Sequence, residues 1–392
     1  MKKKFTKRLL SWVMAAAMVI SMLPISAMAT GTKGAVARIG EQTYATLDEA
    51  LQAASVGTTG EAVTIELLAD ATTKGWQQSK NLTIKAAEDL TQKPKITFDT
   101  EGLALWGVAL EFENIDVVMN GIGATPYGEW KWMAICASKD ASLTLDNVDM
   151  TMDATDTTNS PHAIYFCNNN VLNVKNGSNL TIKNYANDAL EWDGGDGGYN
   201  INIENSTFVS DHNRSGFTGT FYATITNSKV DVINSTGNGS NGSHFIIQDN
   251  SQVNFSNNGS HGLSAGQLEI RNSTVTTKNN HGMGIAVNNQ FIVKNSNVTV
   301  TGNADNKSYG YAAVRLYNDC ESSVDAESTL HINNNNNTGL YVRQGRLTVA
   351  EGADLEIMNN KVGSTLLDGY GGGVYVGYGD NYNPTVVLPS DA

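Results

Sequence analysis

The sequence predicts an all-β protein, a parallel β-helix whose coils of about 22 residues stack along most of the chain. Three observations predict it: one motif recurs at a nearly fixed interval, short runs alternate apolar and polar residues, and turn residues separate these runs. The motif is an alternating apolar run followed by Asn and Ser. Five copies are in register, and their asparagines are Asn205, Asn227, Asn250, Asn272 and Asn295.

The composition of each copy explains why the coils should stack. Short runs with a period of two residues are typical of β-strands, and the Asn, Gly and Ser between them accept the left-handed backbone angles of tight turns. A single coil cannot bury its apolar face, whereas a stack of coils encloses one continuous core. A second column follows at Asn234, Asn257, Asn279 and Gly302. Amides stacked at a strand spacing of about 4.8 Å are expected to hydrogen-bond from coil to coil.

Other repetitive folds fit this pattern less well. Weaker copies of the motif extend it over roughly residues 80–380. A β-propeller needs about 40–45 residues per blade, and a leucine-rich repeat needs a leucine framework that this chain lacks. A β-sandwich would not keep so short a period over so many copies.

We expect four segments along the chain. Residues 1–29 have the basic start, the apolar run and the small-residue cleavage site of a secretory signal peptide. Residues 30–80 form an N-terminal cap, in which Thr46 and Glu49 make a capping box that opens a short helix through Ala54. Residues 81–385 form the β-helix, and residues 386–392 form a C-terminal tail.

The charge of the chain limits its partners. Without residues 1–29 the chain keeps 21 Lys and Arg against 39 Asp and Glu, a net charge of −18. Such a surface repels phosphate backbones and anionic lipid heads, so we expect no nucleic-acid partner and no electrostatic binding to membranes. We also expect no membrane span after signal removal. The three cysteines do not suffice for a disulfide framework. We favour buried thiols at Cys136 and Cys167, with a bridge as the alternative.

The N-terminal part of the mature chain carries a family resemblance. Residues 39–51, followed by residues 63–70, resemble the start of pectate-lyase-like right-handed parallel β-helix proteins, closest in style to those on the surface of Gram-positive anaerobes. With the repeats included, the resemblance covers most of the mature chain and implies a right-handed coil. The superfamily includes pectin-degrading enzymes and non-catalytic adhesins, so the resemblance does not decide the activity.

One acidic segment is the best candidate for chemistry. Residues 187–196 and, one coil later, residues 210–214 bring together carboxylates, an indole and a guanidinium. The catalytic candidates are Asp188, Asp211, His212, Arg214 and His261. The ligand-binding candidates are Glu191, Trp192, Asp193, Trp130 and Trp132. The metal-ligand candidates are Asp188, Glu191, Asp193 and Asp196.

The resemblance implies two possible sets of roles. By analogy with pectate lyases, carboxylates would hold Ca²⁺ against a substrate uronate while Arg214 abstracts a proton. By analogy with polygalacturonases, Asp188 and Asp211 would be the acid/base pair, and His261 would belong to the Ser/Gly-His-Gly element. The chain departs from both patterns, because it lacks the adjacent Asp-Asp pair and has Arg271-Asn272-Ser273 in place of Arg-Ile-Lys.

No catalytic motif is complete, and charged side chains are thinly scattered over regular coils. We therefore expect a secreted or cell-surface protein that is a non-catalytic, adhesin-like or glycan-binding module and a monomer. Its expected partner is an extracellular polysaccharide or a host or cell-surface glycoprotein, and it needs no cofactor. The alternative is a polysaccharide lyase or glycoside hydrolase acting on pectin-like or other acidic polysaccharides, with Ca²⁺ as cofactor if it is a lyase.

Overall fold

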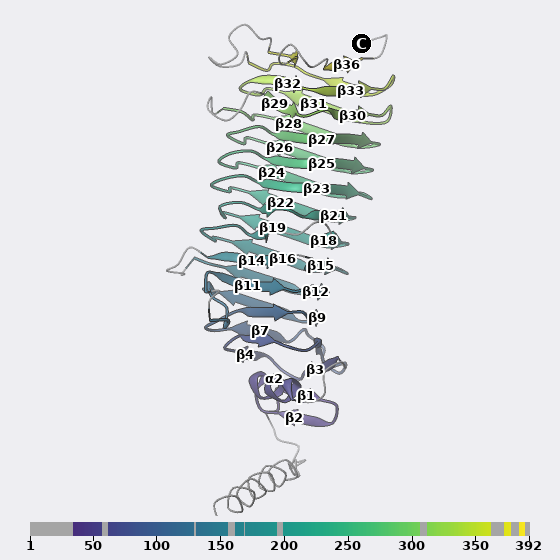
Figure 1. The fold of residues 1–392 in the computed structure, drawn as a ribbon. Helices are drawn as coiled ribbons and strands as arrows, with labels where there is room; N and C mark the ends of the chain where they lie inside the picture. The colour runs from purple at the N-terminus through teal and green to yellow at the C-terminus, as the bar shows by residue number, and fades with distance from the viewer. Residues whose placement is uncertain are drawn as a thin grey trace, which may run out of the picture.

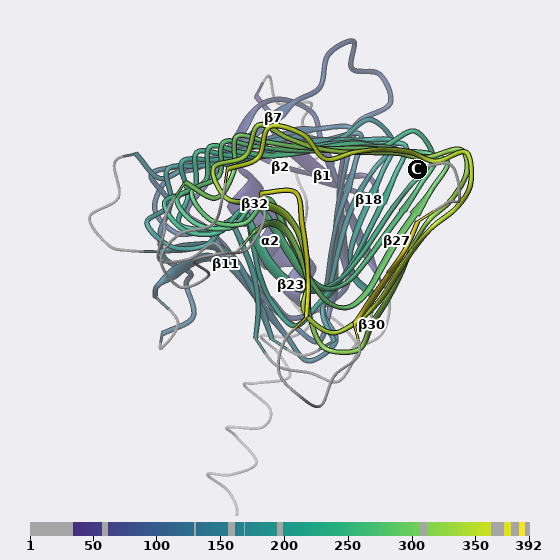
Figure 2. The same ribbon diagram turned by 90° about the horizontal axis from the view of Figure 1, so that it is seen from above.

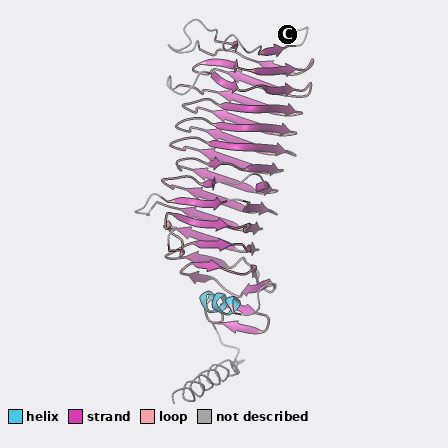
Figure 3. Ribbon diagram, in the orientation of Figure 1, coloured by secondary structure: helices cyan, strands magenta, loops and turns pink. Residues whose placement is uncertain are grey.

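A computed structural model describes residues 34–56, 62–128, 131–155, 161–167, 169–193, 199–305, 312–361, 372–377 and 384–388. The chain rises as a tall stack of coils from the N-terminal region to the C-terminus (Figure 1). Strands make up nearly all of its regular structure, with one described helix at the base (Figure 3). The predicted signal peptide, residues 1–29, lies outside the described residues.

Each coil contributes strands to three faces, which give the solenoid a roughly triangular outline in end view (Figure 2). Face A consists of β5 (Trp76–Gln78), β8 (Leu103–Trp106), β11 (Met133–Ser138), β14 (His162–Cys167), β17 (Leu190–Asp193), β20 (Phe217–Gly219), β29 (Ala312–Leu316), β32 (Thr338–Val342) and β35 (Val374–Val376). Face B consists of β3 (Val63–Leu67), β6 (Leu82–Ala86), β9 (Ala109–Glu113), β12 (Ser142–Asp146), β15 (Val171–Lys175), β18 (Tyr199–Glu204), β21 (Tyr222–Thr226), β30 (Cys320–Val324), β33 (Gly345–Val349) and β36 (Thr385–Val387).

Face C is a separate sheet of 12 strands. Its strands are β4 (Ala71–Thr73), β7 (Lys95–Phe98), β10 (Asp116–Asn120), β13 (Asp149–Asp153), β16 (Asn179–Lys183), β19 (Thr207–Asp211), β22 (Lys229–Ile233), β24 (Gln252–Ser256), β26 (Thr274–Lys278), β28 (Asn297–Thr301), β31 (Thr329–Asn333) and β34 (Asp354–Glu356). The stacked pairs on all three faces are parallel, so the predicted right-handed parallel β-helix is confirmed.

The central coils are the shortest because little or no loop separates their face A and face B strands. In β23 (Ser240–Gln248), β25 (Leu263–Arg271) and β27 (Ile285–Lys294) one strand runs over both face A and face B. These coils therefore need no loop between the two faces. Earlier coils keep such a loop, and their corner asparagines Asn114, Asn147 and Asn176 are spaced 33 and 29 residues apart.

The core is a column of apolar side chains that point inward from all three faces. Strands of face B and face C alternate buried and half-buried residues, as expected for sheets with one face in the core. Aromatic rings of neighbouring coils meet inside: Phe217 lies 5.6 Å from Phe245 and 6.4 Å from Phe255 between ring centroids. The stacked interior thus replaces a globular core.

The motif asparagines occupy the corner between face B and face C, and all five have positive φ, between 44° and 66°. Asparagine tolerates this left-handed conformation better than most residues, which explains its recurrence there. Nδ2 of Asn227 donates to Oδ1 of Asn205, and Asn295 donates to Asn272, each at 2.7 Å. The predicted single file of corner asparagines is therefore confirmed. The second column behaves alike, since Asn279 donates to Asn257 at 3.4 Å.

A further asparagine column was not anticipated from the sequence. Asn258, Asn280, Asn303 and Asn335 directly follow the second polar column and are fully buried. Nδ2 of Asn280 donates to the carbonyl oxygen of Phe255 (2.9 Å) and to Oδ1 of Asn303 (2.8 Å). These amides satisfy backbone groups where the chain turns from face C to face A.

The N-terminal cap has the predicted helix, α2 (Leu47–Ser55), and the antiparallel pair β1 (Ala37–Ile39) and β2 (Gln42–Tyr44). The hydroxyl oxygen of Thr46 accepts a hydrogen bond from the Glu49 N–H (3.2 Å), as a capping box requires. Parallel stacking begins with β3 on β6 and continues to β36 on β33. In the described residues, no helix has the length and apolar character needed to cross a membrane.

The cysteines are free thiols in the structure. Cys136 pairs in register with Tyr165 rather than with Cys167. Burial raises the pKa of both Cys136 and Cys167 to about 11, which makes them unreactive near neutral pH. The favoured prediction of buried thiols holds for Cys136, whereas Cys167 is half-buried.

Candidate functional site

The candidate site lies on the outer surface of face A, over β11, β14 and β17. On these strands Ile164 and Leu190 point into the core, so the register places Tyr165 and Glu191 side by side on the outer surface. His162 and Asp188 lie at the starts of these two coils, where the chain enters face A. We call His162, Tyr165, Asp188, Glu191 and Arg214, together with Trp132, the face A site.

A histidine and two carboxylates converge at this site. His162 is 8 % exposed and Asp188 is fully buried. Nδ1 of His162 lies 2.5 Å from Oε2 of Glu191. One ligand atom from each of His162, Asp188 and Glu191 lies within 4.8 Å of the other two. Burial of so many polar groups on an outer face is unusual, since buried charge is costly unless it is paired.

Arg214 reaches Asp188 from the next coil. Its Nε donates to Oδ1 of Asp188 (3.0 Å) and its Nη2 to Oδ2 (2.5 Å), a two-point contact. The hydrogen bond to Asp188 raises the pKa of the Arg214 guanidinium above its already high value. Arg214 is therefore held in its protonated form against Asp188, which argues against the predicted role as a proton-abstracting base.

Aromatic rings form one wall of the site. The Trp132 side chain is 41 % exposed, and its ring lies edge-on to Tyr165 (4.8 Å between centroids) and His162 (5.3 Å). The Tyr165 hydroxyl donates to Oδ2 of Asp193 (2.6 Å), and burial raises the pKa of Tyr165. One coil below Trp132, the Trp106 ring stacks on the Tyr127 ring, with 5.4 Å between their centroids.

The predicted sugar-binding role of Trp192 is contradicted. Its side chain is 1 % exposed and belongs to the core, where its ring packs 4.8 Å from Phe166. The indole N–H donates to the carbonyl oxygen of Asn170 (3.2 Å). Trp192 points inward because it shares its register position with Phe166, so it cannot stack on a ligand.

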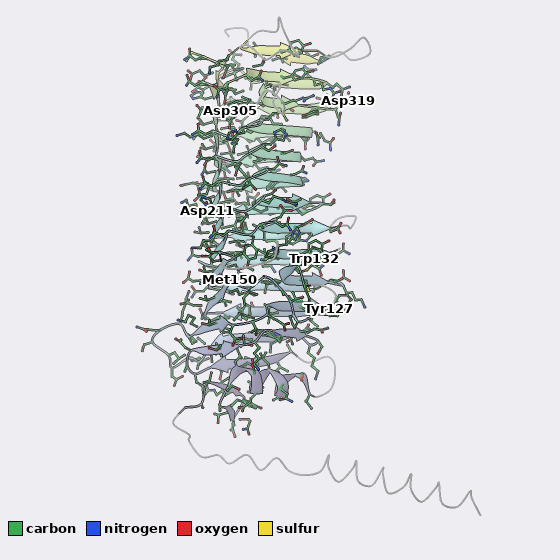
Figure 4. The ribbon with its side chains drawn as sticks, turned by 90° about the vertical axis from the view of Figure 1, so that its left-hand side faces the viewer. Tyr127, Trp132, Met150, Asp211, Asp305 and Asp319 are labelled. Atoms are coloured by element: carbon green, nitrogen blue, oxygen red, sulfur yellow. The ribbon has the colours of Figure 1, made fainter. Side chains whose placement is uncertain are left out.

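The predicted acid/base pair of Asp188 and Asp211 is not brought together. Asp211 ends β19 on face C, where its Oδ1 accepts from Asn234 (2.8 Å) and lies 2.6 Å from Nδ1 of the exposed His212. Figure 4 shows Asp211 toward one edge of the solenoid and Trp132 and Tyr127 toward the other. The corner between face C and face A separates the two carboxylates.

His261 also lies away from the site. It precedes β25, three coils above Asp188, which corresponds to about 14 Å along the axis. Nδ1 of His261 accepts a hydrogen bond from the Met283 N–H (3.0 Å), and burial lowers the pKa of His261. This imidazole has a structural role between two coils.

Only some of the predicted metal ligands and sugar contacts lie at the face A site. Asp188 and Glu191 converge, whereas Asp193 on the next outward position binds the Tyr165 hydroxyl. Asp196 and Trp130 lie outside the described residues. Ca²⁺ usually takes six to eight oxygen ligands, and the described cluster offers two carboxylates and an imidazole nitrogen, so the cluster does not fit Ca²⁺ well.

Sequence reasoning missed the partnership of His162 and Tyr165 with the acidic segment. These residues lie one coil before Asp188, but the interval between His162 and Asp188 is 26 residues rather than 22. The extra residues obscured the alignment of the two coils. The signal was the apolar run of residues 162–167, which has the strand pattern of residues 190–193.

Fold and site together define a right-handed parallel β-helix protein with a histidine–carboxylate cluster on one outer face. No protein-family model and no curated protein matches the sequence. Among solved structures, the chain aligns with the A-module of mannuronan C-5 epimerase AlgE4 from Azotobacter vinelandii (11% identity, 84% of this chain, 93% of that chain, TM-score 0.28). It also aligns with the periplasmic alginate epimerase AlgG (12% identity, 83% and 85% coverage, TM-score 0.29). At these TM-scores the alignments carry no argument about activity.

Proposed function

We propose that this protein is secreted and binds a polysaccharide on face A. The observation that carries the proposal is the exposed Trp132 ring, held edge-on by Tyr165 and His162 beside the Glu191 carboxylate. An exposed indole next to hydrogen-bonding groups suits a sugar ring, which has apolar C–H faces and a rim of hydroxyls. Tyr165 and His162 fix the orientation of the ring before a ligand arrives, which lowers the entropic cost of binding.

The charge of the face A site favours a neutral polysaccharide. Glu191 and Asp193 are carboxylates that accept hydrogen bonds from hydroxyls, and the nearby cation Arg214 is occupied by Asp188. Uronate carboxylates would meet like charge here, and like charges brought together in a partly buried site are destabilising. The same feature argues against the acidic polysaccharide of the alternative prediction.

The length of the site suits a chain of sugars. Trp106, stacked on Tyr127, lies on β8, and Asp193 lies on β17, three coils further along the same outward column. This corresponds to about 14 Å along the solenoid axis. Aromatic and carboxylate groups thus recur along one line rather than around one point.

Binding is tested by titrating the whole purified protein with neutral and acidic polysaccharides in a calorimeter. Trp132→Ala is expected to weaken binding of the neutral polymer by about 10-fold or more, because aromatic contact residues carry much of such binding energy. Tyr222→Ala is the matched control, since Tyr222 packs against His244 on face B, at 5.0 Å. Equal binding by wild type and Trp132→Ala would overturn the proposal.

A second candidate function is catalysis at the same site. The 2.5 Å contact between His162 and Glu191, beside Tyr165, is the kind of close pair that acid/base chemistry uses. If the protein is a lyase or hydrolase, wild type will release unsaturated or reducing sugars from a polysaccharide and Glu191→Gln will not. Binding without any product in wild type would exclude this candidate.

A further inference from the structure

The His162 side chain has an unusual environment for a buried imidazole. It is nine-tenths buried, yet its Nδ1 makes no hydrogen bond. Oε2 of Glu191, 2.5 Å away, is buried and makes no hydrogen bond either. Buried polar atoms almost always have hydrogen-bond partners, so two such atoms facing each other call for an explanation.

Asp188 completes a ring of three potential ligands. It comes from the next coil, is fully buried, and places a carboxylate oxygen within 4.8 Å of both other ligand atoms. Arg214 binds both oxygens of Asp188. A carboxylate has about four lone-pair positions, so this contact leaves acceptor capacity on Asp188.

We propose that His162, Asp188 and Glu191 form a binding site for a divalent metal ion of the zinc class. An imidazole nitrogen and carboxylate oxygens are ligands that Zn²⁺ accepts, and three protein ligands leave a fourth position for water or a substrate oxygen. A cation bound by both atoms satisfies both lone pairs once the Glu191 carboxylate turns away from the imidazole to the wider spacing of two ligands on one metal ion. Arg214 then acts as an outer partner that orients the Asp188 carboxylate.

A second histidine–carboxylate group provides a matched comparison. Nε2 of His331, on face C, lies 3.0 Å from Asp354 and 3.6 Å from Glu356. The Asp354 side chain is 64 % exposed, so water can solvate this group. It has the same residue types as the proposed site, but it is less buried and Nε2 of His331 is hydrogen-bonded to Asp354.

The test is a calorimetric titration of the whole protein with Zn²⁺ after treatment with a chelator. Wild type is expected to bind one Zn²⁺ per chain, and His331→Gln is expected to bind it equally. Glu191→Gln and His162→Gln are expected to weaken binding by more than about 100-fold, because loss of an outer partner alone costs about 10- to 100-fold. Circular dichroism of each variant checks that the solenoid is folded.

Cobalt provides a readout that depends on the ligands and not on activity. Wild type loaded with Co²⁺ is expected to show the visible absorption of a four-coordinate site, and Glu191→Gln is expected to lose it. Absence of Zn²⁺ binding in wild type, or binding that is lost in His331→Gln and kept in folded His162→Gln, would overturn the proposal. Because the probe is the metal alone, this result is independent of polysaccharide binding.

Discussion

Asparagine has two separate structural roles in this chain. At the exposed corners, Asn279 adopts a φ of 54°, and Gly302 takes the equivalent position one coil later with a φ of 70°. The next residue, Asn280, is fully buried and bonds to the coils below and above it. Adjacent asparagines therefore serve different needs, one of backbone conformation and one of hydrogen bonding.

This difference predicts opposite outcomes for two neighbouring substitutions. Asn280→Ala removes bonds to the carbonyl oxygen of Phe255 and to Asn258, leaving buried polar groups unsatisfied. It should lower the free energy of unfolding by about 2–4 kcal/mol. Asn279→Gly should change it by less than about 1 kcal/mol, because Gly adopts positive φ freely. Urea unfolding of both variants checks the prediction, and equal effects would contradict the division of roles.

A buried histidine makes the stability depend on pH. Burial lowers the pKa of His261, and its Nδ1 accepts a hydrogen bond only while the ring is neutral. The unfolded chain therefore takes up a proton more readily, so His261 stabilises the fold above about pH 6.5, and this contribution falls as the pH drops from there toward the folded-state pKa. Thermal unfolding from pH 8 to pH 5 should show a smaller loss of Tm for His261→Gln than for wild type. A parallel loss in both would refute this assignment.

The side chains of the site show where residue-level prediction succeeds and fails. Asp188, Glu191 and Arg214 were predicted because charged residues in one short segment are visible in the sequence. The inward orientation of Trp192 depends on its register with Phe166, which composition does not reveal. Register in a strand decides which face every side chain occupies, so an uncertainty of one residue reverses the prediction.

At the scale of elements, the strands and the capping helix follow from local pattern. The period of two predicted the strands, and the Thr46–Glu49 capping box predicted the start of α2. The fusion of face A and face B strands in β23, β25 and β27 was not predicted, because Asn241-Gly242 and Asn288-Asn289, which usually indicate turns, lie where the two faces meet. The interval from His162 to Asp188 is also longer than the 22 residues of the motif, and this difference concealed that the two residues lie on neighbouring coils.

The helix α2 is expected to protect the first coil locally. Its residues Leu47 and Ala50 are fully buried, and the helix contacts β1 and β3. Leu47→Ala should lower the local free energy of unfolding by about 2–5 kcal/mol, because it leaves a cavity under the helix. Amide hydrogen exchange in β3 and β6 should therefore become faster. The central coils should keep their exchange rates, because each coil contacts only its neighbours. Gln52→Ala on the exposed side of α2 is the control, and uniform acceleration along the solenoid would contradict a local role.

At the scale of the whole molecule, the repeat makes coils interchangeable units. The interval from Asn250 to Asn272 is one coil of 22 residues. Deleting residues 250–271 should give a folded protein one coil shorter, because Asn272 then follows Asp249 in the same corner position. Deleting only residues 250–260 should abolish folding, since it removes the face C strand β24 and joins the end of face B directly to the start of face A. Circular dichroism and small-angle scattering check both; a folded product of the shorter deletion would contradict coil-by-coil stacking.

The molecule is a repetitive scaffold whose face A departs from regularity at particular places, and the face A site is one of them. On the central coils the outer surface of face A carries small or polar residues, such as Thr218, Asn241 and Ser264 on successive coils. The buried polar residues and exposed indole of the face A site depart from that regularity. Where a regular scaffold departs from its own pattern, function is the expected cause.

The most direct test of this account is a crystal structure of the protein with a bound neutral oligosaccharide. The account predicts a sugar ring against Trp132, with its hydroxyls donating to Glu191 and the chain of sugars running along the solenoid axis. A ligand bound on face B or face C, with the face A site empty, would contradict it.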